Sequence, residues 1–272
     1  MIFAVDIGNT NVVIAAIENQ EVKKIWRIAT DTKRTADEYT SIVISMLRDG
    51  NFTPEDFSDS VLSSVVPSLI GVFINVCSFI CKKKPFIVNG QLMKIESFPI
   101  HCPSGVENQL GTDLICNAVA ARNLFKGSPA ITVDFGTALS IIAIDSKGTV
   151  RGVSILPGLA TAVHSLSSNT AQLPEVPLKA PTSVLGLDTV TSIQSGVVLG
   201  YKGLVEYLVK SMKDELEKVT GDKKENIKVV ATGGLNSVLK PITDCFTVVE
   251  KNLTLNGLSL IFEWSKNNPV QI

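Results

Sequence analysis

The chain is poor in the residues that build metal centres and disulfide frameworks. Its 272 residues include only five cysteines and two histidines, and no two cysteines form a CxxC pair. An odd, scattered set of cysteines is typical of free thiols in a reducing compartment. We therefore expect neither a zinc site nor a disulfide scaffold, and a cytoplasmic protein.

The chain also lacks an excess charge of either sign and a long hydrophobic run. The 25 basic residues nearly balance the 26 acidic ones, so no long-range field attracts nucleic acid or an acidic membrane. No segment offers the roughly 18 unbroken apolar residues of a membrane helix. The first residues lack the basic and apolar regions of a signal peptide. With 45% hydrophobic residues the chain can bury a sizeable core, which excludes intrinsic disorder.

Apolar runs and turn signals predict an α/β chain. Residues 3–5 and 12–17 read as two strands of a hairpin. The capping-box sequence Thr35-Ala-Asp-Glu38 predicts the start of a helix. A strand at 61–66, a helix at 73–81 and a short strand at 86–88 complete a β-β-α-β-α-β unit, followed by an irregular stretch at 89–110. A helix is expected to begin near Thr112.

The opening pattern returns about halfway along the chain. The sequence DIGNT at Asp6 and the sequence DFGT at Asp134 each separate two apolar strands. Such a turn can be an ordinary tight turn in which Asp and Asn bond their own backbone. It can also hold phosphate oxygens, because glycine permits close approach and turn N–H groups can point at an anion. Two copies, and a Thr-Gly-Gly turn at 232–234, favour the second reading and a duplicated chain.

Two long helices are expected in the second half. Residues from about 195 to 219 place Tyr201, Val205 and Val219 on one apolar stripe. A strand at 228–231 precedes the Thr-Gly-Gly turn, and a helix at 253–266 closes the chain.

These turns resemble the motifs of a known superfamily. DIGNT at Asp6, DFGT at Asp134 and ATGG at Ala231 resemble the phosphate-1, phosphate-2 and adenosine motifs of the acetate kinase, Hsp70, actin and sugar kinase superfamily. Finer matches, spread over residues 2–262, resemble type III pantothenate kinase. They include Trp26-Arg27, Ser63-Ser-Val-Val-Pro67, Gly111-Thr-Asp113, Leu173-Pro174, Gln194-Ser-Gly196 and Leu253-Thr-Leu255.

The resemblance implies a fold and an activity. The fold would be α/β, with two similar ribonuclease-H-like (actin-like ATPase) halves of mixed sheets flanked by helices. Residues 1–111, joined by part of a closing C-terminal helix, would form one domain and residues 112–272 the other, with an ATP cleft between them. The activity would be ATP-dependent phosphorylation of pantothenate to 4′-phosphopantothenate, the first step of coenzyme A biosynthesis. A homodimer, Mg²⁺ and a monovalent cation, K⁺ or NH₄⁺, are implied as well.

The resemblance also implies residue roles. Asp6 would hold Mg²⁺ through water, and Asp134 would lie near the monovalent cation. Asp113 would be the general base for the pantothenate hydroxyl, although a carboxylate at the start of a helix also serves as a cap. The remaining contacts implied for ATP are Gly8, Asn9, Thr10, Gly136, Thr137, Gly233 and Gly234. Those implied for pantothenate are Gly111 and Thr112, with Thr189 reaching across the dimer interface.

Three positions depart from the family pattern. Leu114 stands where an arginine is expected to bind the pantothenate carboxylate, and Asn169 where a basic residue lines the same pocket. Leu139 replaces a hydroxyl residue after the second Asp-x-Gly turn. Two alternatives therefore stay open: a kinase for a different alcohol, and a non-catalytic nucleotide-binding protein with a regulatory role.

Overall fold

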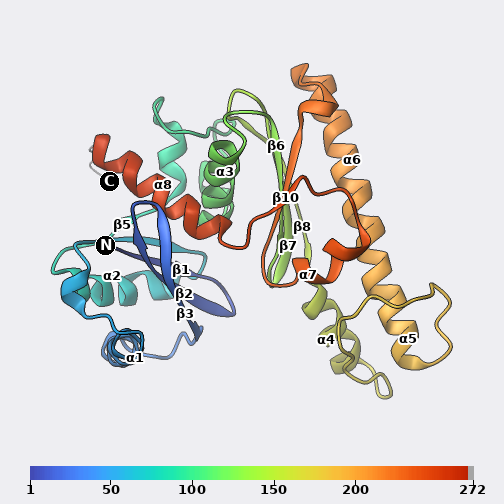
Figure 1. The fold of residues 1–272 in the computed structure, drawn as a ribbon, viewed down its shortest axis with the longest axis horizontal. Coiled ribbons are helices and arrows are strands. Elements are labelled where there is room, and N and C mark those ends of the chain that lie inside the picture. Colours follow the sequence, from blue (N-terminus) through green and yellow to red (C-terminus); the bar gives the residue numbers. More distant parts are fainter. Residues whose placement is uncertain (269–272) are drawn as a thin grey trace. The chain divides into compact units, whose positions relative to one another are not determined.

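The computed structural model describes residues 1–268, which form two compact units (Figure 1). The first contains residues 1–120 together with the C-terminal helix α8 (Leu253–Asn267), and the second contains residues 121–252. The division falls inside helix α3 (Thr112–Leu124) rather than before it, where the sequence suggested it. The first turns of α3 belong to the first unit because α8 packs directly against their backbone at Cys116.

The first unit is built on a mixed sheet in the order β3-β2-β1-β4-β5. Strand β1 (Ile2–Ile7) pairs antiparallel with β2 (Asn11–Glu18), which pairs antiparallel with β3 (Glu21–Ala29). On its other side β1 is parallel to β4 (Asp59–Ser64), and β4 is parallel to β5 (Phe86–Ile87). The predicted hairpin is confirmed, whereas β3 was missed.

Helices cover both faces of this sheet. Helices α1 (Ala36–Asp49) and α2 (Pro67–Cys81) bury their apolar sides against one face, and α8 contacts β1 and β4. Thr35 caps α1 through the predicted capping box. Helix α2 begins earlier than the predicted residue 73, because Pro67 occupies its first turn, where a missing N–H costs nothing.

The second unit repeats the first sheet strand for strand. Its order is β8-β7-β6-β9-β10, with antiparallel pairs β8–β7 and β7–β6 and parallel pairs β6–β9 and β9–β10. The strands are β6 (Ala130–Phe135), β7 (Ala138–Ile144), β8 (Val150–Pro157), β9 (Lys228–Thr232) and β10 (Val248–Val249). The duplication inferred from the two Asp-x-Gly turns is therefore confirmed in the topology.

The long helix of the second unit starts earlier than predicted. Helix α5 (Thr189–Gln194) continues through a π-helical turn (Ser195–Leu199) into α6 (Gly200–Thr220). Val205 and Leu216 are buried against the sheet, but Val219 is 62% exposed, so the apolar stripe ends a turn earlier than expected. The shorter helices are α4 (Leu159–Asn169) and α7 (Asn236–Leu239). No helix among residues 1–268 has both the length and the apolar character to cross a membrane.

Short 3₁₀ turns connect the longer elements. The stretch at 89–110 is irregular, as predicted, and holds two such turns, Gly90–Lys94 and Glu107–Gln109. The others are Pro54–Asp56, Lys224–Asn226 and Lys240–Ile242.

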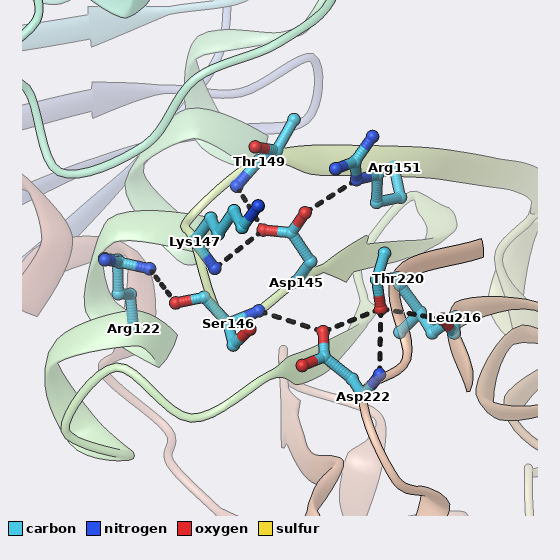
Figure 2. Close-up of polar contacts among 9 residues, drawn as sticks. All are labelled: Arg122, Asp145, Ser146, Lys147, Thr149, Arg151, Leu216, Thr220 and Asp222. Carbon is cyan, nitrogen blue, oxygen red and sulfur yellow. Dashed lines mark hydrogen bonds and ion pairs between the residues drawn. The ribbon is translucent and has the colours of Figure 1, made fainter. Parts of the chain in front are cut away.

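A polar network holds the turn between β7 and β8 (Figure 2). The carboxylate of Asp145, 1% exposed, accepts hydrogen bonds from the N–H groups of Lys147 (2.9 Å) and Thr149 (2.8 Å) and from Arg151 Nε (2.7 Å). Asp222, after α6, accepts the Ser146 N–H at 3.1 Å. Both oxygens of the Asp145 carboxylate thus have protein donors, which is how a buried carboxylate is tolerated. The network fixes the hairpin that continues from the DFGT turn.

Candidate functional site

Each sheet carries an aspartate at the same position of its central strand. Asp6 lies opposite Val13 of β2 and Ser63 of β4. Asp134 lies opposite Ser140 of β7 and Thr232 of β9. Both carboxylates are half-buried at strand ends, and each faces a hydroxyl residue on the neighbouring parallel strand. The two units thus present the same carboxylate-and-hydroxyl edge.

The first Asp-x-Gly turn is braced by Thr30, the residue that follows strand β3. Gly8 N–H donates to the Asn11 carbonyl oxygen at 3.0 Å and is therefore used within the turn. Thr30 donates through its hydroxyl to Gly8 O at 2.6 Å and through its N–H to Thr10 O at 2.9 Å. Asn9 and Thr10 are exposed. With the carbonyl groups held on one side, the polar groups that reach solvent come from Asn9 and Thr10 rather than from Gly8.

The second turn is braced in the same manner. Gly136 N–H donates to Ala138 O at 3.1 Å. The Thr137 carbonyl oxygen accepts the Gly158 N–H at 2.9 Å and the Thr161 hydroxyl at 2.8 Å. A side chain at Gly158 would collide with the Gly136 and Thr137 carbonyl groups, so helix α4 can start only this close to the turn with glycine there. Gly136 and Thr137 are exposed.

The Thr-Gly-Gly turn after β9 passes over the end of β6. Gly233 has a φ of 84°, and a Cβ there would lie 2.6 Å from Asp134 Oδ1. Only glycine fits both the left-handed conformation and the contact. Gly234 is exposed, with open space where a side chain would be. The structure thus brings Asp134, Gly136 and Gly233 together in the second unit.

Asp113 is held at the start of α3. Its Oδ1 accepts the Leu114 N–H at 2.8 Å and lies where a side chain at Gly111 would be. The Thr112 and Ser63 hydroxyl groups hydrogen-bond at 2.9 Å. Burial raises the pKa of the Asp113 carboxyl, against the opposing effect of backbone N–H donors. A carboxyl with a raised pKa is a better proton acceptor than an ordinary aspartate.

Asp6 and Asp113 face the same buried thiol. The pKa of Cys116, on α3, is raised well above its ordinary value, first by burial and then by the negative charges of Asp6 and Asp113. Asp6 and Asp113 therefore both lie near Cys116 in the first unit, and Thr112 is linked to the same region through Ser63, the residue opposite Asp6. Thr189 belongs to the second unit, where it is exposed at the first turn of α5.

The donor set fits the ions that the resemblance implies. Mg²⁺ and K⁺ prefer oxygen ligands, and Mg²⁺ is commonly held by one or two carboxylates with substrate phosphates and water. Asp6 supplies a carboxylate beside an exposed turn. Asp134 supplies another, whose Oδ1 would lie 3.7 Å from a Cβ at Gly136 and closer to one at Gly233.

The three departures from the family pattern have different surroundings. Leu114 is only 5% exposed. Asn169 is exposed at the end of α4, where its amide donates to Ser165 O of the same helix at 2.9 Å. Leu139 is fully buried in the core beneath the sheet. The third change is therefore a packing substitution, whereas Leu114 is a buried apolar residue next to Asp113 in the sequence.

Sequence reasoning missed the residues that brace the site. Thr30 and Thr161 hold the two turns. Ser63 was noted only as part of a family motif, without its hydrogen bond to Thr112. Asn117, fully buried one helical turn after Asp113, was missed as well. Its only sequence signal is the spacing of four residues, which puts two helical residues on one face.

The fold of this chain is also found in solved structures. A protein assigned to the Baf family of transcriptional activators from Campylobacter jejuni matches with a TM-score of 0.56 and 19% identity, over 98% of each chain. A protein assigned as 2-dehydro-3-deoxygalactonokinase from Sinorhizobium meliloti matches with a TM-score of 0.53 and 11% identity, over 100% of this chain and 98% of that one. These likenesses show that the chain shares its fold with both proteins.

The family follows from the sequence model. The type III pantothenate kinase family model matches residues 2–211, and the chain belongs to that family. This membership supports an ATP-dependent phosphotransferase of the kinase type.

Proposed function

We propose that the protein phosphorylates pantothenate at its primary hydroxyl, using ATP, to give 4′-phosphopantothenate for coenzyme A synthesis. The observation that carries the proposal is the placement of Asp113, whose half-buried carboxylate lies, like that of Asp6, near Cys116 in the first unit. Phosphoryl transfer needs positioned groups and neutralised charge more than covalent help. Asp113 has only to orient the hydroxyl and accept its proton as the new bond forms.

The two braced turns are proposed to hold the ATP phosphates. Asn9 and Thr10 supply exposed amide and hydroxyl donors in the first unit, and Thr137 supplies a hydroxyl in the second. Gly8 and Gly136 keep each turn tight, since their N–H groups close it. Mg²⁺, when bound, would neutralise phosphate charge, and Asp6 would hold it through water. Asp134 is proposed as the carboxylate nearest K⁺ or NH₄⁺.

The glycines after β9 are proposed to lie under the adenosine. Gly234 is exposed with no atom near its missing side chain, so a flat ring can approach the backbone there. Gly111 and Thr112 are proposed to contact pantothenate together with Asp113. An ATP cleft between the two halves of the chain stays a prediction. The five cysteines are free thiols, which agrees with the cytoplasmic location we propose.

One observation favours a second acceptor, a related alcohol without a carboxylate. Leu114 is 5% exposed and adjacent to Asp113, and it cannot pair with an anion. Leaving a substrate carboxylate without its charged partner costs roughly 2–5 kcal/mol of binding. A neutral amide derivative of pantothenate would avoid this cost.

A comparison of two acceptors distinguishes pantothenate from a neutral alcohol as the substrate. ADP release is measured for wild type and Leu114→Arg, with pantothenate and with its neutral amide. We expect Leu114→Arg to lower the KM for pantothenate at least about tenfold. A charge-assisted pair with the substrate carboxylate would add about 1.4 kcal/mol or more of binding free energy, and 1.4 kcal/mol corresponds to a factor of ten. The KM for the amide serves as the control and should change little. Turnover of the amide alone by wild type would favour the neutral alcohol, and turnover of neither would favour a non-catalytic protein.

We also propose a homodimer in which Thr189 of one copy reaches the pantothenate site of the other. The segment that carries Thr189 exposes large apolar side chains: Val184 is 70%, Leu185 75% and Leu187 95% exposed. Clustered apolar exposure of this kind is typical of an interaction surface. The four-residue patch is completed by Val190, 40% exposed.

Sedimentation velocity at micromolar concentration tests the dimer. Wild type should sediment as a dimer and Leu187→Asp as a monomer, because the substitution places a charge in the apolar patch. Ser183→Asp, a charge of the same sign on an exposed polar residue of this segment, serves as a control for charge alone. A monomeric wild type would contradict both the dimer and the role of Thr189.

A further inference from the structure

A buried amide lies one helical turn beyond Asp113. Asn117 is 0% exposed, and its spacing of four residues puts it on the same face of α3 as Asp113. Burial, together with the negative charges of Asp6 and Asp113, raises the pKa of Cys116, the residue next to Asn117. Asn117 thus shares a helix face with Asp113, and the residue beside it lies near both carboxylates of the first unit.

Helix α8 fixes one end of that amide. Thr254 Oγ1 donates a hydrogen bond to Asn117 Oδ1 at 2.8 Å. A primary amide accepts at its oxygen and donates at its nitrogen. With Oδ1 directed to Thr254, Nδ2 is the end that turns away from α8. An ionised carboxylate only accepts hydrogen bonds, so only the nitrogen end of the amide can donate to one.

The reach of Thr254 depends on how closely α8 packs. A Cβ at Gly257 would lie 2.5 Å from the carbonyl carbon of Cys116 and 2.8 Å from its Cα, so the two helix backbones meet there without an intervening side chain. Gly257 follows Thr254 by one helical turn. The close crossing therefore brings the Thr254 hydroxyl to Asn117.

We propose that Asn117 is a positioning residue of the site, whose amide Thr254 orients so that its Nδ2 donates toward the carboxylates of Asp6 and Asp113. The inference rests on the proposed function, which gives both carboxylates a role in phosphoryl transfer. Hydrogen-bond donors directed at a carboxylate hold it in one orientation and stabilise its ionised form. Helix α8 thereby contributes to the site through an orienting contact, without reaching the reacting atoms.

The kinetic test compares two substitutions of Thr254. Thr254→Val keeps the shape and removes the hydroxyl, whereas Thr254→Ser keeps the hydroxyl. We expect Thr254→Val to lower kcat about tenfold with the KM for ATP within about twofold, because misplaced catalytic groups slow the chemical step more than binding. Thr254→Ser should retain wild-type kcat. Equal kcat in wild type and Thr254→Val would overturn the proposal, as would equal losses in both variants.

A second substitution keeps the test decisive if Thr254→Val folds poorly. Asn117→Asp keeps the size of the side chain but replaces the NH₂ donor of the amide with a negatively charged carboxylate oxygen. We expect its kcat to fall further than that of Thr254→Val, since like charges then face Asp6 and Asp113. Wild-type kcat in a folded Asn117→Asp protein would contradict the inference.

A spectroscopic test needs no turnover. The side-chain NH₂ resonances of Asn117, identified by their loss in Asn117→Asp, should exchange slowly with water in wild type and Thr254→Ser. In Thr254→Val we expect exchange at least about tenfold faster, because the amide loses its fixed orientation. Equal exchange in all three would refute the orienting role. If wild type turns over no alcohol yet shows this pattern, the proposed function fails while the orientation of Asn117 stands.

Discussion

Replacing Asp113 with asparagine is expected to lower kcat by about 10²–10⁴-fold, the range typical of a lost general base. Asparagine fills the same space, and its Oδ1 can still accept the Leu114 N–H that Asp113 accepts at 2.8 Å. The helix start is therefore preserved while proton acceptance is lost. ATP affinity, measured by calorimetry, should stay within about twofold. Near-normal turnover would mean that Asp113 serves as a helix cap only.

The same substitution should not cost stability at neutral pH. Burial raises the pKa of Asp113, so the folded state binds its proton more tightly than the unfolded chain does. The resulting stabilisation is present below the unfolded pKa, about 3.9, and is lost as pH rises through the folded pKa. At neutral pH the ionised carboxylate opposes folding, and Asp113→Asn removes that charge. We expect an unchanged or higher Tm.

The raised pKa of Asp113 also determines how activity depends on pH. The base works only when ionised, so kcat/KM should fall as pH drops through the raised pKa of Asp113. The acid limb should therefore lie above the pKa of an ordinary aspartate. An acid limb at or below that value would contradict a buried base.

The largest expected loss of stability comes from Asp145→Ala. Its carboxylate accepts hydrogen bonds from Arg151 Nε at 2.7 Å and from two backbone N–H groups of the β7–β8 turn (Figure 2). Removing the carboxylate leaves the Arg151 guanidinium and the two backbone N–H groups without their acceptor, which should lower the free energy of unfolding by about 2–4 kcal/mol. The Arg151 side chain is 38% exposed, so water recovers part of the loss. Urea unfolding measures the change.

Lys147→Ala is the matched control for Asp145→Ala. Lys147 lies in the same turn but joins the network only through its backbone N–H, so its truncation should change the free energy of unfolding by no more than about 0.5 kcal/mol. If Asp145→Ala proved as stable as Lys147→Ala, the network would not be what holds the hairpin.

The fold could be predicted where a local pattern sufficed. The hairpin around DIGNT, its copy around DFGT and the capping box at Thr35 could all be predicted, because each depends on residues close together in the sequence. Strand β3 was not, because its turn places Asn19 and Gln20 at φ of 51° and 64° without the glycine that usually marks such a hairpin. Strand β8 was missed because its exposed edge position does not demand an apolar run.

The candidate site residues, too, could be predicted only where they belong to a local sequence motif. Asp6, Asp113 and Asp134 stood out because each belongs to a short motif, and the structure places them at strand or helix ends. The groups that brace them are distant in sequence: Thr30 from Gly8, and Thr254 from Asn117. Such contacts depend on tertiary packing, which no local pattern encodes.

The most direct test of the account is ADP formation by the purified protein with ATP, Mg²⁺ and pantothenate, in potassium and in sodium buffer. We predict turnover that requires pantothenate and potassium, on the order of 1 s⁻¹ or more, and that falls by at least about 10²-fold in Asp113→Asn. No turnover in either buffer, from folded protein that binds ATP, would contradict it. The protein would then share the fold and family of the kinases without their reaction on pantothenate.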